Sequence, residues 1–278
     1  MVTDLIQGDR FEKVAHFTFA PVEKSSGDYS KLMNTFTIEK CFEYDPCIIY
    51  THTFYVKYLF DMLSGINHKF IVVTHNCDTN VDFLPPANVI QWHTQNLNIQ
   101  DERMKPIPIG LENDRWFVST NKKEKMIDKY RENRYHYNIA YMNFNISTNP
   151  SKRQLPFDLF KDKPWVTTDM GANGNKFDEY IDNIYKHKFV ICPEGNGIDT
   201  HRVWEALYMD SIPIVKRSIL AEELYSYFPV LIVDKWEDVS EWLLTKEFEV
   251  IQEIKSNFDG HRGMLTFEYW KNKIQQWI

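Results

Sequence analysis

Short apolar runs alternate with helix-patterned segments along most of the chain, and this alternation constrains the fold most strongly. In the first series, strands are predicted at 47–50, 70–74, 88–92 and 105–109, with a helix at 54–63. In the second, strands are predicted at 137–142, 165–168, 189–192, 212–215 and 230–233, with helices at 177–187, 200–209, 220–227, 239–256 and 265–278. Uniformly apolar strands separated by helices are typical of parallel sheets covered on both faces. We therefore predict an α/β protein with two Rossmann-like domains that face each other across a cleft.

Length and charge narrow the class of protein. The chain has 278 residues, enough for two domains of roughly 100–150 residues each. A net charge of −7 argues against a protein that coats nucleic acid. The charged stretch 121–134 is interpreted as a connection or a surface helix between domains, and a solvated face within one domain is the alternative. We place the first domain at 1–125 and the second at 126–262.

The cysteines and the first residues of the chain help to predict the cellular compartment in which the protein works. The four cysteines match no zinc template and form no disulfide framework, so we expect reduced thiols in an intracellular protein; they are Cys41, Cys47, Cys77 and Cys192. No signal peptide is visible after Met1, and no apolar run is long enough to span a bilayer. These patterns predict a cytoplasmic protein without an integral membrane segment.

The segment 189–215 carries the most informative pattern. A buried strand ends at Cys192, a loop with Gly195 and Gly197 follows, and Arg202 lies in the first turn of the next helix. The free N–H groups of a helix N-terminus suit a phosphate, and a planar guanidinium can hold a diphosphate. Glu205 lies on the same helical face and could accept hydrogen bonds from both hydroxyls of a ribose. An ordinary strand–turn–helix with a surface Arg–Glu pair is the alternative.

This segment resembles the donor-site signature of exostosin-like glycosyltransferases. The matching residues are Pro193-Glu194-Gly195, then Arg202 with Glu205-Ala206-Leu207, then Ser211-Ile212-Pro213-Ile214. Related enzymes usually carry Gly before the Ile-Pro step, where this chain has Asp210-Ser211. The length and flanking segments are also similar to short exostosin-like transferases of large algal viruses, among them one thought to add xylose to a capsid glycan. A viral origin would place the protein in the cytoplasm of the host cell.

The resemblance implies a GT-B fold, with a nucleotide-sugar donor on domain 126–262 and a glycan acceptor on domain 1–125. It implies an inverting enzyme, and a UDP-sugar is the expected donor. The segment 263–278 would then cross back to the first domain, although a plain terminal helix is an equal alternative. Thr168 and the polar run after the strand 137–142 could also meet the donor, with an Asx-rich turn as the alternative. The expected donor-binding residues are Glu194, Gly195, Asn196, Gly197, Arg202, Glu205, Asn145, Asn149, Arg153 and Thr168.

Polar residues after strands of the first domain are candidates for catalysis. An inverting transferase needs a base that takes the proton of the acceptor hydroxyl, and a carboxylate or an imidazole can do this. Asp78 is the first candidate, His75 the second, and Glu194 a rival from the donor side. A helix-capping Asp and a hydrogen-bonded structural His are the alternatives.

Further polar residues follow the later strands of the same domain. We expect them to line the acceptor site, with packing between the domains as the alternative; they are His93, Gln95, Asn96 and Glu112. The chain has no Asp-x-Asp run and no His pair at metal spacing, so neither metal nor cofactor is expected. Arginines and a helix dipole would then meet the diphosphate charge.

Two other classes of protein compete with the transferase. A non-catalytic two-lobed protein that closes on a sugar or a nucleotide would share the domain pattern. A dehydrogenase would need Gly-x-Gly-x-x-Gly after the first strand, and this chain lacks it.

Overall fold

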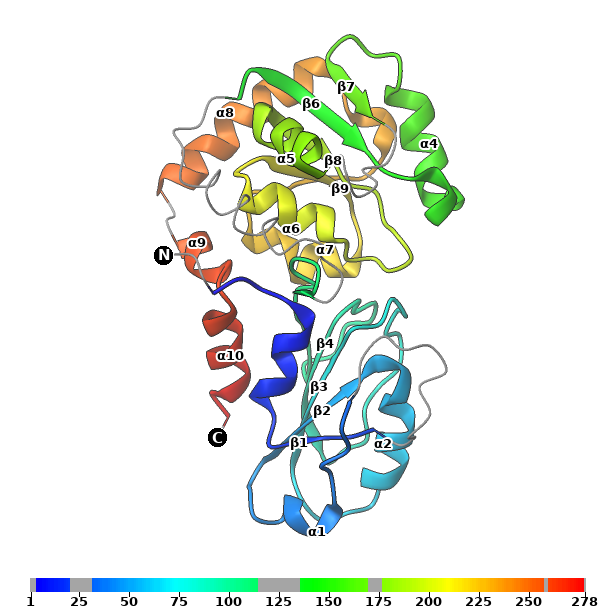
Figure 1. The fold of residues 1–278 in the computed structure, drawn as a ribbon, viewed down its shortest axis with the longest axis vertical. Helices are drawn as coiled ribbons and strands as arrows, with labels where there is room; N and C mark the ends of the chain where they lie inside the picture. The colour runs from blue at the N-terminus through cyan, green and yellow to red at the C-terminus, as the bar shows by residue number, and fades with distance from the viewer. Residues whose placement is uncertain (1–3, 21–31, 115–135, 170–176, 258–259, 278) are drawn as a thin grey trace.

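The computed structural model describes residues 4–20, 32–114, 136–169, 177–257 and 260–277. Figure 1 shows two lobes stacked along the long axis of the molecule. Each lobe contains a parallel sheet of five strands, which confirms the predicted α/β class with two parallel sheets. The expected domain boundary near 125 and the charged stretch 121–134 lie outside the described residues.

The N-lobe holds its strands in chain order across the sheet. They are β1 (Phe17–Thr18), β2 (Cys47–His52), β3 (Phe70–His75), β4 (Val89–Thr94) and β5 (Met104–Pro106). The helical segments are η1 (Gly8–Val14), α1 (Ile38–Cys41), η2 (Thr53–Tyr55) and α2 (Val56–Leu63). Strands β2 and β3 are buried along almost their whole length, as their continuous apolar sequence requires. The two-residue strand β1 was not predicted, because so short a run carries no periodicity.

The C-lobe has a different strand order, β10-β9-β8-β6-β7. The strands are β6 (Asn138–Asn143), β7 (Val166–Asp169), β8 (His187–Ile191), β9 (Ile212–Lys216) and β10 (Leu231–Val233). The helices are η4 (Ile146–Thr148), α4 (Pro150–Phe160), α5 (Phe177–Lys186), α6 (His201–Tyr208), α7 (Ile219–Glu223), η6 (Tyr225–Tyr227), η7 (Trp236–Asp238) and α8 (Glu241–Asn257). Because β6 has β7 on one side and β8 on the other, the chain order reverses there. In open α/β sheets such a reversal marks the crevice where ligands bind.

Alternate residues of the C-lobe strands face opposite sides of the sheet. In β6, Ala140 and Met142 belong to the hydrophobic cluster that also contains Phe160 of α4 and Leu244 of α8. Tyr141 belongs instead to the larger cluster, which includes residues of both lobes. One hydrophobic cluster therefore extends across both lobes, and a second lies within the C-lobe.

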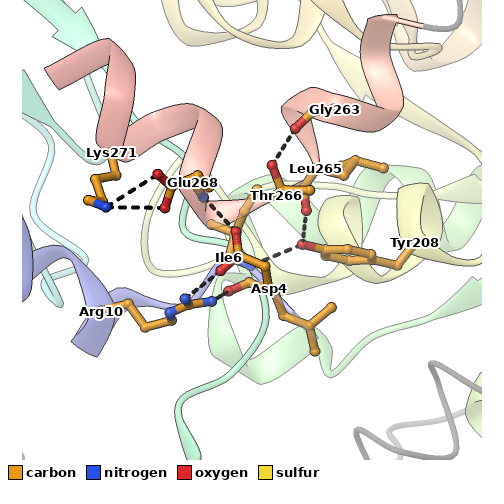
Figure 2. Close-up of polar contacts among 10 residues, drawn as sticks. Asp4, Ile6, Arg10, Tyr208, Gly263, Leu265, Thr266, Glu268 and Lys271 are labelled. Atoms are coloured by element: carbon orange, nitrogen blue, oxygen red, sulfur yellow. Dashed lines mark hydrogen bonds and ion pairs between the residues drawn. The ribbon is translucent and has the colours of Figure 1, made fainter. Parts of the chain in front are cut away.

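The last described elements, α9 (Gly260–Met264) and α10 (Phe267–Gln275), lie beside the N-terminal segment (Figure 1). The rings of Phe267 and Phe11 meet edge to face at 5.2 Å, which packs α10 against η1. Tyr208 of α6 accepts the Ile6 N–H at 3.0 Å and donates to the Leu265 carbonyl at 2.6 Å, as Figure 2 shows. One buried phenol thus joins α6 to both segments. No helix among the described residues has the length and apolar character needed to cross a membrane.

Candidate functional site

The reversal point of the C-lobe sheet lies between the carboxyl ends of β6 and β8, and hydrogen bonds join the two loops that start there. Asn149 donates from Nδ2 to the Gly195 carbonyl at 2.7 Å. Arg153 donates from Nε to the Glu194 carbonyl at 2.9 Å and from a terminal nitrogen to the Asn145 carbonyl at 2.8 Å. These bonds join five of the expected donor-binding residues. Asn149 and Arg153 contribute their side chains, whereas Asn145, Glu194 and Gly195 contribute backbone oxygens.

Two guanidinium groups flank Phe144 at this point. Arg153 lies 5.8 Å and Arg202 5.9 Å from the centre of the Phe144 ring. Burial, and then the charge of Arg202, lower the pKa of Arg153 to about 10, so it stays charged at neutral pH. Within the described residues, neither guanidinium forms an ion pair with a carboxylate. Glu205 lies close enough for its charge to act on Arg202, but two neighbouring cations that no carboxylate contacts directly are costly away from water, and an anionic ligand would relieve that cost.

Two buried polar atoms at the start of α6 lack a hydrogen-bond partner within the described part of the chain. They are Thr200 Oγ1 and Arg202 Nε. Thr200 occupies the N-cap position of α6, yet its side chain makes no capping bond. A buried polar atom without a partner costs about 1–3 kcal/mol, and nearly all such atoms in folded proteins are satisfied. The start of α6 therefore has unused hydrogen-bonding capacity, as expected of a ligand site.

Glu205 is buried one turn further along α6. Its Oε2 accepts the hydroxyl of Tyr180, a residue of α5, at 2.5 Å. Burial, and then the charge of Glu205, hold the pKa of Tyr180 well above its ordinary value, so the phenol keeps its proton and donates it. Oε1 of Glu205 has no partner among the described side chains, which leaves one oxygen able to accept from a ligand. Sequence reasoning missed Tyr180, because nothing marks it apart from other buried positions of an amphipathic helix.

The loop before α6 is attached to the N-lobe through Asp199. Its carboxylate accepts the Ile109 N–H at 2.7 Å, the Trp204 indole N–H at 2.8 Å and the Tyr225 hydroxyl at 2.6 Å. Burial raises the pKa of Asp199 to about 6. The Asp199 N–H in turn donates to Asn96 Oδ1 at 2.9 Å. The carboxyl ends of both sheets therefore meet at this loop.

His201, the first residue of α6, adds a second attachment. Its Nδ1 lies 2.8 Å from the Gly110 carbonyl, and its Nε2 lies 3.3 Å from Glu112 Oε2. Burial alone would lower the pKa of His201, but the hydrogen bond and the charge of Glu112 outweigh it and raise the pKa to about 9. A protonated imidazole therefore stands directly before Arg202 at neutral pH.

The structure speaks against His75 as a base. Its Nδ1 accepts the Asn76 N–H at 2.7 Å, and its Nε2 donates to the Pro108 carbonyl at 3.0 Å. Burial lowers the pKa of His75 to about 4, and its ring stacks on Phe11 at 4.9 Å. No lone pair remains to receive a proton, so His75 is a hydrogen-bonded structural residue. Asp78 is exposed on the loop after β3, where its carboxylate is accessible.

Three of the four expected acceptor-binding residues are buried, which corrects that expectation. His93 is 2%, Gln95 1% and Asn96 0% exposed, so a glycan cannot reach them. Asn96 instead bonds to the donor-side loop, and Glu112 pairs with His201. The structure places these two residues at contacts between the lobes.

The remaining donor-side residues have mixed placements. Asn145 accepts from Ser147 within its own turn, and Asn196 is exposed. Gly197 lies against the N-lobe, since a Cβ there would be 2.6 Å from Asn96 Nδ2. Thr168 Oγ1 is buried and lacks a partner among the described residues. Glu194 forms an ion pair with Lys152 at 2.9 Å.

A polar cluster at the carboxyl edge of the N-lobe sheet was not predicted. Asn76 follows β3 with a left-handed φ of 57°. Its Nδ2 donates to Asp9 at 2.9 Å, and its Oδ1 accepts from Asn113 at 3.1 Å. The position of Asn76 directly after a predicted strand could have indicated a polar cluster there. Asp9 lies in a segment without a recognisable hydrophobic periodicity, so its part in the cluster could not be predicted.

No protein-family model matches the chain, and no curated protein matches it. Among the described residues, no three or more His, Cys, Asp and Glu side chains are grouped so that they could hold a metal ion.

Proposed function

We propose that the protein is a GT-B glycosyltransferase of the exostosin-like type. It would move a monosaccharide, with inversion, from a nucleotide sugar to a hydroxyl of a glycan acceptor. The observation that supports this best is the unsatisfied start of α6, where Thr200 Oγ1 and Arg202 Nε lack partners among the described residues. A diphosphate supplies oxygen acceptors and the negative charge that Arg202 and Arg153 lack.

The contacts suggest how the reaction would be divided between the lobes. The acceptor oxygen forms a bond to the anomeric carbon while the bond from that carbon to the diphosphate breaks, and the leaving group keeps the electron pair. Arg153, Arg202 and the N-terminus of α6 would stabilise that charge. The free Oε1 of Glu205 would accept a hydroxyl of the ribose. Asp78 is the proposed base, since its carboxylate is exposed after β3.

The donor is proposed on two grounds. Uridine is proposed because it is the commonest nucleoside of sugar nucleotides, and xylose because of the resemblance to the viral transferases, so UDP-xylose is the first donor to test. Arg202, Arg153 and the protonated His201 bring positive charge to the start of α6, so we propose that turnover needs no metal ion. Activity should persist in EDTA.

The first test is donor binding by titration calorimetry with UDP and a panel of UDP-sugars. Arg202→Gln should weaken binding about 10- to 100-fold, because a charged hydrogen bond contributes about 1.5–3 kcal/mol. Lys161→Gln removes a charge from an exposed site of the same lobe and should leave binding unchanged. Equal affinities for the wild type and Arg202→Gln would refute the proposed donor site.

Nucleoside diphosphate release separates a transferase from a two-lobed binding protein. The transferase should release UDP in the presence of a glycan acceptor, and Asp78→Asn should slow that release at least about 100-fold without changing donor affinity. A protein that binds UDP-sugars tightly and leaves them intact with every acceptor would instead support the binding-protein alternative.

A further inference from the structure

An aromatic row lies exposed on the N-lobe beside the polar cluster. Phe54 in η2 is 71% exposed and Tyr58 in α2 is 60% exposed. Four residues apart, they lie on one face of the helical segment. The opposite face of α2 is buried through Val56 and Leu59, so burial does not explain the outward rings. Adjacent large exposed aromatics are uncommon on a solvated surface and indicate a contact site.

Ring contacts connect this row to the carboxyl edge of the sheet. Phe54 meets Tyr55 edge to face at 5.3 Å, and Tyr55 stacks on His52 at 6.3 Å with an interplanar angle of 7°. His52, the last residue of β2, contacts the Tyr50 ring at 6.2 Å. The Tyr50 hydroxyl accepts from Asn76 Nδ2 at 3.3 Å. Three intervening rings therefore link Phe54 to the polar cluster of Asn76 and Asp9.

Hydrogen bonds carry the connection onward to the start of α6. Asn76 bonds to Asn113, whose N–H donates to Glu112 Oε1 at 2.9 Å. Glu112 pairs with His201, which directly precedes Arg202. A continuous line of contacts thus runs from the proposed diphosphate site to Phe54. A molecule bound on the row would lie at the same edge of the N-lobe as that site.

The size of the row favours a small occupant. Phe54 and Tyr58 together expose roughly 300 Å², given about 150–250 Å² for a whole aromatic side chain. A stable protein interface needs about 800 Å² from each partner. The two rings alone supply less than half of that area, and they match one or two sugar rings, whose C–H faces stack on aromatics.

A second segment packs on the neighbouring face of α2. The segment with Asp82 and Phe83 packs beside α2, because Lys57 lies 4.6 Å from the Phe83 ring centre and Phe60 meets the same ring at 6.4 Å. Asp82 and Tyr58 are both exposed. The phenol of Tyr58 gives the row one group that can donate and accept hydrogen bonds.

We propose that Phe54 and Tyr58 form the platform on which the saccharide acceptor stacks, in place of the buried His93, Gln95 and Asn96. This inference rests on the proposed function and specifies its acceptor subsite. The occupant is a neutral saccharide, with its reacting end toward the Asn76 cluster and the rest of the glycan along α2.

The test compares the wild type with the double variant Phe54→Ala/Tyr58→Ala. The acceptors are 4-nitrophenyl glycosides of xylose, glucose, galactose, mannose and fucose, with UDP-sugar at saturation. The KM for the acceptor should rise about tenfold with little change in kcat, a loss of about 1.4 kcal/mol. The single variant Tyr58→Phe keeps both rings and should retain most of the wild-type affinity for the acceptor. Trp242→Ala, which removes a ring that is 71% exposed on α8, is the matched control and should have no effect.

Two further readouts separate this inference from the proposed function. Donor affinity and acceptor-independent hydrolysis should be unchanged in the double variant, since neither ring touches the donor site. Saturation-transfer NMR with the same glycosides tests the platform even if no donor binds. An unchanged KM, or glycoside signals equal in wild type and double variant or lacking in both, would overturn the platform. A wild-type dimer that the double variant abolishes would also overturn it, because the row would then be an interface between copies.

Discussion

Raising the pH should weaken the contact between the lobes through one ion pair, His201 with Glu112. The pKa of His201 is raised from 6.5 to about 9: burial opposes the rise, and the hydrogen bond and charge of Glu112 outweigh it. Because the folded pKa lies above the unfolded one, the protonated imidazole stabilises the folded form. That stabilisation is complete below pH 6.5 and is lost as the pH rises through about 9.

The size of the effect follows from the same values and from exposure. The difference between pH 6.5 and about 9 corresponds to at most about 3.4 kcal/mol, at 1.36 kcal/mol for each pH unit. The His201 and Glu112 side chains remain 30% and 35% exposed, so water screens the pair. We therefore expect a loss of about 1–2 kcal/mol in the free energy of unfolding.

The assay is urea unfolding of the wild type and of Glu112→Gln at several pH values between 6.5 and 9.5. The variant should be less stable at the low end, and the two curves should converge at the high end. The buried His75 and His93, whose burial lowers their pKa to about 4 and about 3, do not titrate in this window. A wild-type advantage that stays constant across the range would refute the reasoning.

Two substitutions test other contacts of the same boundary. Gly197→Ala should lower the free energy of unfolding in urea by about 1–3 kcal/mol, because its Cβ would lie 2.6 Å from Asn96 Nδ2. Gly263→Ala is the control, since a Cβ there would meet no described atom within 4 Å. Equal losses for the two variants would contradict the proposed crowding at Gly197. Tyr208→Phe should cost about 2–4 kcal/mol, since it leaves the Ile6 N–H and the Leu265 carbonyl buried without a partner. The exposed Tyr227→Phe is its control in thermal unfolding, and equal melting temperatures for the two variants would contradict that account.

The sequence predicted the strands well where burial is uniform. Strands β2 and β3 each contain a run of four buried apolar or aromatic residues, and that pattern does not depend on the neighbouring strand. The order β10-β9-β8-β6-β7 could not be predicted in this way, because pairing is decided by packing between distant segments. Arg153 and Arg202 were nevertheless placed in one site, since each follows a strand whose carboxyl end borders the reversal.

The acceptor side was less accessible to sequence reasoning. His93 and Gln95 look like surface residues after a strand, but the surrounding structure buries them. The bond from His75 to the Pro108 carbonyl joins residues far apart in the chain, so no local pattern reveals it. Phe54 and Tyr58 were hidden within an ordinary amphipathic helix, where apolar residues normally indicate core.

The contacts of the Tyr208 phenol also determine when one part of the protein can fold during its synthesis. Leu5 pairs with Thr266, and Ile6 shares its tyrosine partner with Leu265, so the earliest described segment finds these neighbours only after residues near 266 leave the ribosome. Domains generally fold as units while translation proceeds. The N-lobe sheet can therefore assemble early, whereas the junction seen in Figure 2 can close only once residues 265 and 266 have been synthesised.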